Sequence, residues 1–129
     1  MIRITVILFM FLWASALHCQ SITYKSFATE YSKGIGGILP LEKLPREIIV
    51  SKDSISIVSH GRESTAIQRW KVNHINEVGD HATYHCHILN KDLEYPAIFT
   101  IVQFEGKVEL IEYEGLGLEG GKNARFFIE

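Results

Sequence analysis

Five of the six histidines lie between His60 and His87, and three of them alternate along one short segment. His81, His85 and His87 are separated by even numbers of residues, so on a β-strand their imidazoles would point to the same face. Imidazole nitrogen is a common ligand of zinc and copper, and a complete site needs three or four ligands. The spacing therefore offers a surface metal site formed by these three histidines, with Glu77 as an assisting ligand.

A simpler interpretation of the same residues is a solvated strand face that is rich in histidine. Lys71 is predicted to lie beside His87, and its ammonium group would disfavour a bound cation there. Cys86 points to the opposite face of the strand and cannot join the cluster. We therefore expect no cofactor and keep zinc or copper binding as the alternative.

A second group of side chains is predicted on the other face of the same hairpin. Gln68, Trp70 and His74 alternate along one predicted strand, and Tyr84 lies opposite His74 on the next. An apolar face with a few converging polar groups is typical of small-molecule pockets. These four residues form the candidate ligand-binding site. The structural alternative is that His74 lies at the edge of the core and is satisfied by the Tyr84 hydroxyl.

Two-residue alternation bounded by turn formers predicts the strands that position these side chains. Segments 65–77 and 82–88 flank a turn at 78–80. With three turn residues unpaired, the predicted partners are Trp70 with Ile88, Val72 with Cys86, His74 with Tyr84 and Asn76 with Ala82. A one-residue slip would bury Lys or His against Trp70, which costs more than any turn preference supplies.

Two further hairpins follow from the same pattern. Segments 47–51 and 54–59 flank Lys52-Asp53, which sets Val50 opposite Ile55 and Ile48 opposite Ile57. Segments 98–104 and 108–113 flank a three-residue turn. The predicted partners there are Phe104 with Val108, Val102 with Leu110, Ile101 with Ile111 and Phe99 with Tyr113.

The remaining segments complete an all-β pattern. A first strand is predicted over 22–31 and a closing strand over 124–128. Between 33 and 46 lies a loop rich in Gly and Pro, whose leucines at 39, 41 and 44 are expected to pack against the core. The predicted fold is a small antiparallel meander of about seven or eight strands, as a curled or barrel-like sheet.

The first nineteen residues are typical of an export signal. Arg3 precedes an apolar run from Val6 to Ala14, which is too short to cross a membrane as a helix. We therefore expect residues 1–19 to be a signal peptide and residues 20–129 to be a single antiparallel β domain. The mature chain would be secreted or periplasmic, without a membrane span.

The cleavage point decides the cysteine chemistry. Cleavage after Ala16 leaves Cys19 available for a disulfide with Cys86, whereas cleavage after Cys19 leaves Cys86 alone. Attachment of a lipid at Cys19 is a third outcome, although His18 occupies a position where a lipid-attachment motif has a small residue.

The charge balance and the absence of known catalytic or phosphate-binding motifs reduce the number of expected functions. The chain has 13 basic and 15 acidic residues, without clusters of Lys or Arg, so nucleic acid is not an expected partner. A phosphate loop is excluded because Leu116 and Asn123 stand where the motif requires Gly and Ser or Thr. No nucleophile with a base and an orienting acid is recognisable. We therefore expect a non-catalytic domain that binds a small ligand or a partner protein.

Overall fold

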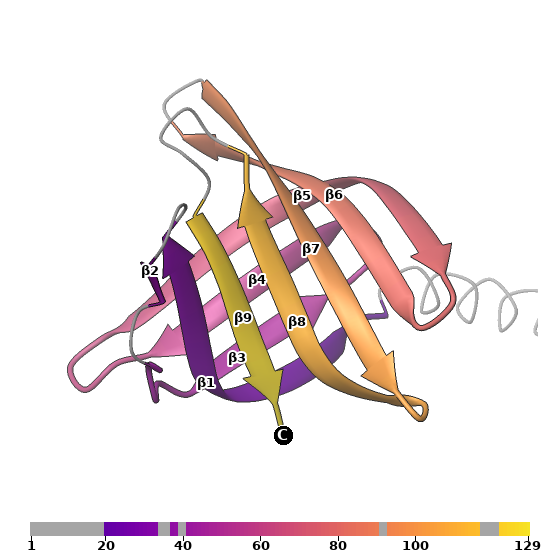
Figure 1. Ribbon diagram of the computed structural model, residues 1–129. Coiled ribbons are helices and arrows are strands. Elements are labelled where there is room, and N and C mark those ends of the chain that lie inside the picture. The colour runs from indigo at the N-terminus through magenta and orange to yellow at the C-terminus, as the bar shows by residue number, and fades with distance from the viewer. Residues whose placement is uncertain (1–19, 34–36, 39–40, 91–92, 117–121) are drawn as a thin grey trace, which may run out of the picture.

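The computed structural model describes residues 20–33, 37–38, 41–90, 93–116 and 122–129, and within them the chain forms strands and turns without a helix (Figure 1). The strands are β1 (Ile22–Lys33), β2 (Gly37–Ile38), β3 (Arg46–Val50), β4 (Ser54–His60), β5 (Thr65–Val78), β6 (His81–Asn90), β7 (Leu93–Phe104), β8 (Lys107–Gly115) and β9 (Lys122–Ile128). In these residues no helix has the length and apolarity that a membrane crossing requires. The predicted cleavage sites and Cys19 lie outside the described residues.

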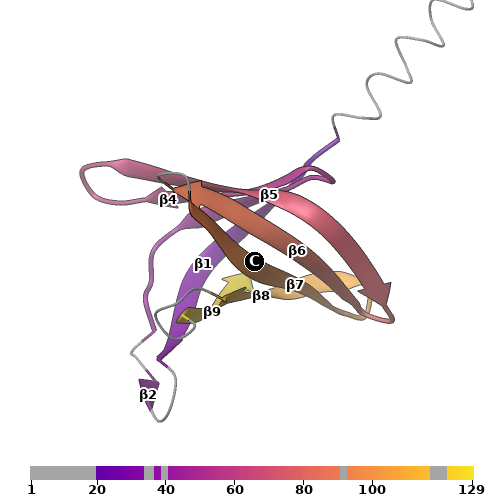
Figure 2. The same ribbon diagram turned by 90° about the horizontal axis from the view of Figure 1, so that it is seen from above.

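Eight of the strands close into an antiparallel barrel, which confirms the predicted all-β meander. Each strand from β3 to β8 pairs with the next one along the chain, and β9 pairs back with β1. The short β2 pairs only with the end of β1 and lies outside the ring (Figure 2). Sequential hairpins build this topology because neighbours in sequence become neighbours in the sheet.

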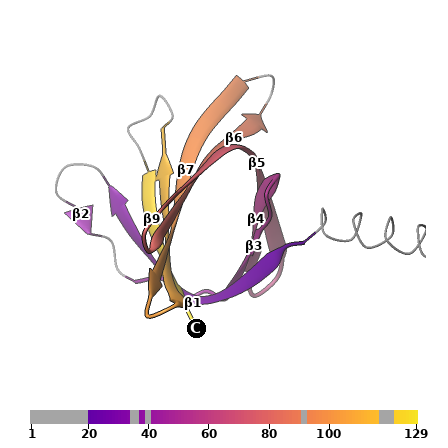
Figure 3. The same cartoon turned by 90° about the vertical axis from the view of Figure 1, so that its right-hand side faces the viewer.

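Strand β1 closes the barrel by changing partners along its length (Figure 3). Its first part, Ile22 to Ser26, pairs with β3, and its second part, Ser26 to Lys33, pairs with β9. A bulge between Ser26 and Ala28 separates the two parts. Beyond Ser26 the second part of β1 has no ladder with β3, and only an isolated bridge joins Thr29 to Glu42. The seam between the second part of β1 and β3 is therefore closed by the two main-chain hydrogen bonds of this bridge and by side chains.

The hairpin of β3 and β4 has the predicted register. Ile48 pairs with Ile57 and Val50 with Ile55, and all four side chains are buried. Apolar residues at alternate positions place one face of both strands in the interior of the barrel.

The hairpin of β5 and β6 has the predicted register only in the part distant from the turn. Val72 pairs with Cys86 as predicted, but a bulge before His74 shifts every later pair by one residue. Ile75 then lies opposite Tyr84, and His74 pairs with His85 on the exposed face. The predicted inward position of His74 is therefore wrong, because the bulge turns the apolar Ile75 inward in its place.

The hairpin of β7 and β8 repeats this pattern. Val102 pairs with Leu110 and Ile101 with Ile111 as predicted, whereas Phe104 pairs with Lys107 rather than Val108. The turn residues Glu105 and Gly106 have φ angles of 51° and 80°, which suit a two-residue turn with both central residues left-handed. In both hairpins a two-residue turn replaces the predicted three-residue loop, and a bulge lies before the turn on β5 and after the turn on β8.

The interior of the barrel carries the predicted apolar side chains. Trp70 and Cys86 are buried, as are Ile48, Ile55, Phe99 and Ile111. Leu41, by contrast, is 47% exposed, so its predicted packing against the core is wrong. Leu39 lies outside the described residues. On β6, the core-facing positions alternate with His81, His85 and His87, which places these histidines on the outer face as predicted.

Candidate functional site

A cavity of about 400 Å³ lies inside the ring of strands, at the end where β1, β4 and β8 end and β3, β5 and β9 begin. Strands from both sides of the barrel supply its walls. Its lining consists of Tyr31, Ser32, Arg46, Ile57, Ser59, Gln68, Trp70, Tyr113, Asn123, Ala124 and Phe126. Six aromatic and aliphatic side chains therefore share this space with the polar side chains of Ser32, Arg46, Ser59, Gln68 and Asn123.

Three aromatic rings pack together at one wall of the cavity. The ring of Trp70 meets Phe99 edge-on, with centroids 5.1 Å apart, and lies 5.7 Å from the ring of Tyr113. Phe99 and Tyr113 are also 5.1 Å apart. These separations suit edge-to-face and tilted aromatic contacts. Phe99 is fully buried, so this cluster joins the cavity wall to the packed core.

The indole nitrogen of Trp70 has no partner among the described residues. Its Nε1 is buried. Among the buried side-chain nitrogen and oxygen atoms of the described residues, it is the one that forms no hydrogen bond. Buried donors are almost always paired in folded proteins, because leaving one unpaired costs about 1 to 3 kcal/mol. This exception belongs to a residue that lines the cavity.

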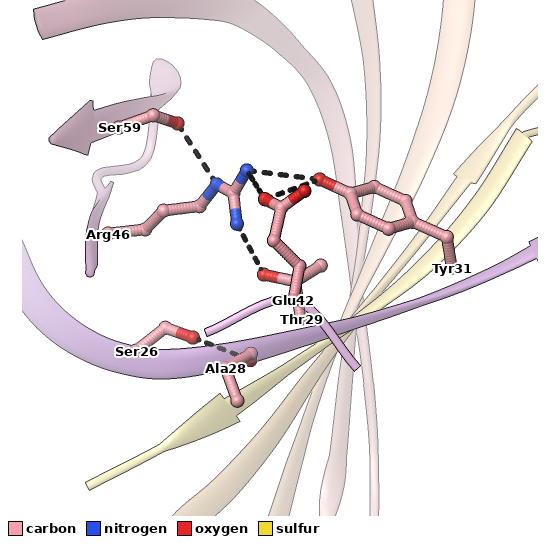
Figure 4. A network of polar contacts seen from close by, with 7 residues as sticks. All are labelled: Ser26, Ala28, Thr29, Tyr31, Glu42, Arg46 and Ser59. Carbon is pink, nitrogen blue, oxygen red and sulfur yellow. Dashed lines mark hydrogen bonds and ion pairs between the residues drawn. The ribbon is translucent and has the colours of Figure 1, made fainter. Parts of the chain in front are cut away.

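A buried arginine forms the polar wall (Figure 4). The guanidinium of Arg46 donates through Nε to Ser59 Oγ at 3.0 Å and through one terminal nitrogen to Thr29 Oγ1 at 2.7 Å. Its other terminal nitrogen donates to the Tyr31 hydroxyl at 3.0 Å and to Glu42 Oε1 at 2.5 Å. Arg46 on β3 thereby reaches the second part of β1, where the backbone ladder between these strands is absent.

The positive charge of Arg46 is balanced by the carboxylate of Glu42, a residue that does not line the cavity. Its side chain is 9% exposed, whereas that of Glu42 is 44% exposed and does not line the cavity. The guanidinium carbon also lies 6.0 Å from the centroid of the Phe126 ring, at the limit of a cation–π contact. Burial raises the pKa of Tyr31, with the nearby Arg46 opposing and Glu42 reinforcing that shift. The cavity wall is thus close to neutral.

Two of the four predicted ligand-binding residues line this cavity. Trp70 is in the wall and Gln68 is exposed at the mouth. Tyr84 is partly buried against the core and does not belong to the lining, and burial raises its pKa. His74 lies on the outer face for the reason given above.

Arg46 is not among the site residues predicted from the sequence, although the sequence contains a signal for it. Arg46 shares the even-numbered face of β3 with the buried Ile48 and Val50. A charged residue in phase with buried aliphatic positions must have an internal partner, because an unpaired buried charge is costly. Its partners on β1 and in the connection before β3 depend on chain closure, which local patterning does not reveal.

The ring of His85, one of the three predicted metal ligands, lies beside the ring of His74, which was predicted for the ligand pocket and not for the metal site. His74 and His85 have ring centroids 5.7 Å apart. Within the described residues, no three side chains of His, Cys, Asp or Glu are grouped so that they could hold a metal ion. Zinc or copper binding by His81, His85 and His87 stays a prediction, which a calorimetric titration with zinc would test.

Cys86 is placed as a core residue. Its thiol is buried and donates towards the Tyr84 carbonyl oxygen at 3.6 Å. Burial raises the pKa of this thiol to about 11, so it stays protonated at neutral pH. A protonated, inaccessible thiol is a poor nucleophile.

A second hollow, of about 350 Å³, is bordered by β1, β7, β8 and β9. Its lining includes the charged side chains of Glu30, Glu112, Glu114 and Arg125. Small-molecule sites are mostly apolar with few polar groups, so the aromatic cavity is the better candidate.

We compared the chain with protein-family models, with curated proteins and with solved structures. None of the three comparisons found a match.

Proposed function

We propose that this protein is an exported, non-catalytic binding protein whose barrel holds one small molecule in the cavity beside Arg46 and Trp70. The observation that carries this proposal is the cavity of about 400 Å³ inside the ring of strands. The apolar run that follows Arg3 supports export.

The size and chemistry of the cavity support ligand binding. A barrel of eight strands is just wide enough for side chains to fill it or for one small ligand to enter. Small-molecule pockets measure about 300 to 1,000 Å³ and combine apolar walls with a few well-placed polar groups. Here the rings of Trp70, Tyr113 and Phe126 supply apolar wall, and Ser59 and Gln68 supply polar groups.

The lining also supports a non-catalytic role. The lining residues that the structure describes include no His, Cys, Asp or Glu. General acid–base catalysis needs a group that titrates near the working pH. The charged lining residue, Arg46, is engaged by four oxygen acceptors.

The test is the binding of N-phenyl-1-naphthylamine, an uncharged dye whose emission rises in apolar surroundings. The full chain is expressed so that any export signal is processed by the cell. We expect saturable binding with one site per chain. Ala124→Leu adds a larger side chain to the lining and should weaken dye binding at least about tenfold, a loss of about 1.4 kcal/mol.

The matched control introduces the same residue elsewhere. Gln103→Leu changes an exposed position beside the turn at 105–106, outside the cavity lining. It should leave dye binding as in the unmodified protein. Absence of saturable binding, or equal binding by both variants, would contradict the proposed function.

A further inference from the structure

We infer that the cavity is selective for an uncharged amphiphile, a molecule with an apolar body and one hydrogen-bonding end, and that it discriminates against organic anions. This inference rests on the proposed function and adds the chemical class of the ligand. It follows from the way in which Arg46 is neutralised.

Arg46 is the charged residue in the described lining of the cavity. A buried guanidinium would ordinarily attract an anionic ligand, because planar bidentate pairing with a carboxylate is strong. In this structure, four of its N–H groups already donate to Ser59, Thr29, Tyr31 and Glu42. The guanidinium has five N–H groups, so one is left for a ligand.

The counter-ion of Arg46 is held in place by the main chain. The amide of Thr29 donates to the Glu42 carbonyl at 2.9 Å, and the amide of Glu42 donates to the Thr29 carbonyl at 2.9 Å. The Tyr31 hydroxyl lies 3.4 Å from Glu42 Oε1 and can donate to it. An anion that pairs with the guanidinium through two N–H groups would have to displace a partner already in place, and the backbone of the residue that supplies the carboxylate, Glu42, is bridged to the barrel wall.

A second anion beside this pair would be poorly compensated. Two carboxylates would share one guanidinium in a partly dry site, and like charges at short range repel strongly there. An alcohol, amide or carbonyl group carries no such penalty. It can bond the hydroxyl of Ser59 or the amides of Gln68 and Asn123, while its apolar part contacts Trp70 and Phe126.

Decanol and decanoate test this inference because they have equal chain lengths and differ in charge at neutral pH. Each is titrated into the protein loaded with N-phenyl-1-naphthylamine, and displacement of the dye is measured. We expect decanol to displace the dye at a concentration at least about tenfold lower than decanoate.

Glu42→Gln removes the counter-ion while keeping a side chain of similar shape. The uncompensated guanidinium should then accept the carboxylate, so the preference for decanol should shrink at least about threefold or reverse. Glu63→Gln makes the same charge change at an exposed position in the β4–β5 connection and should leave the preference unchanged. The comparison of the two ligands in the unmodified protein needs neither variant to fold.

The outcomes separate this inference from the proposed function. If the dye binds but decanoate displaces it as well as decanol does, the selectivity is wrong and the cavity still binds ligands. If the preference is present but Glu42→Gln and Glu63→Gln shift it equally, the role of Glu42 is wrong. If the dye does not bind at all, the proposed function itself fails.

Discussion

Two parts of the barrel interior are built differently. The packed region, defined by Ile48, Ile55, Phe99 and Ile111, consists of side chains with no exposed surface. The cavity region instead combines aromatic rings with a hydrogen-bonded arginine and leaves about 400 Å³ unfilled. The difference shows that polar residues which bond one another across a seam can hold barrel walls in place without filling the space between them.

The two ends of the barrel differ in their connections as well. The hairpins at 51–53, 79–80 and 105–106 turn within two or three residues, whereas the cavity end has one two-residue connection, 91–92, and three longer ones, 34–45, 61–64 and 116–121. Short turns bring paired strands together directly. A longer connection can supply a side chain from outside the ladder, as the segment before β3 supplies Glu42.

The largest effect is expected in the packed region. Phe99→Ala removes a fully buried ring that contacts Trp70 and Tyr113, and should lower the free energy of unfolding by about 3 to 5 kcal/mol. Urea denaturation measures this change. Phe104→Ala, at a side chain 65% exposed, is the matched control and should change stability by less than about 0.5 kcal/mol. Equal losses in the two variants would contradict the assignment of Phe99 to the packed region.

Arg46→Met tests whether polar bonding closes the seam of the cavity region. The loss of four charge-assisted hydrogen bonds should lower the free energy of unfolding by about 2 to 3 kcal/mol. The expected loss is below that for a fully buried pair, because the half-exposed Glu42 can be hydrated. Arg62→Met, in an exposed turn, is the control. A stability equal to that of the control would show that the seam does not need Arg46.

Two alanines probe the free space directly. Ala97→Leu forces a larger side chain among buried core residues and should cost about 1 to 3 kcal/mol. Ala124→Leu can extend into the cavity and should change the free energy of unfolding by less than about 0.5 kcal/mol. Denaturation of both variants under the same conditions measures the difference. Equal destabilisation would mean that the two regions are packed alike.

The last expected effect concerns a single ionisable group of the packed interior, the thiol of Cys86 in the core cluster. Burial raises its pKa to about 11, whereas an unfolded chain has an ordinary thiol pKa of about 8.5. The folded state therefore holds its proton more tightly, and the resulting stability is complete below the unfolded pKa and is lost as pH rises towards 11. Between pH 8 and pH 10 the unmodified protein should lose about 1 kcal/mol or more relative to Cys86→Ala. If the free energy of unfolding changed with pH in the same way in the unmodified protein and in Cys86→Ala, the thiol would not be buried in solution.

Local patterning predicted the parts of the fold in which hydrophobic alternation is regular. The pairing of Ile48 with Ile57, Val72 with Cys86 and Ile101 with Ile111 follows from placing apolar residues on one face. Local patterning failed near the turns. A bulge can move one residue from the turn into the strand without changing which residues pair in the part of the hairpin that is distant from the turn. That single change moved His74 from the predicted site to the outer face.

The candidate site was predicted only in part, for a related reason. Gln68 and Trp70 line the cavity because they lie on the regular part of β5, before the bulge. Arg46, Tyr31 and Glu42 come from segments that meet only when β1 closes the barrel.

The sequence by itself determined an antiparallel β fold, the apolar face of the β3–β4 hairpin and of the regular part of β5–β6, and the outward histidines of β6, because strand side chains alternate with a period of two. Only the tertiary structure decided that the sheet closes, where the bulges lie and that Arg46 binds Thr29, Tyr31 and Glu42 across the seam. These features depend on contacts between residues distant in the chain, whose energies decide between arrangements that local patterning leaves equivalent.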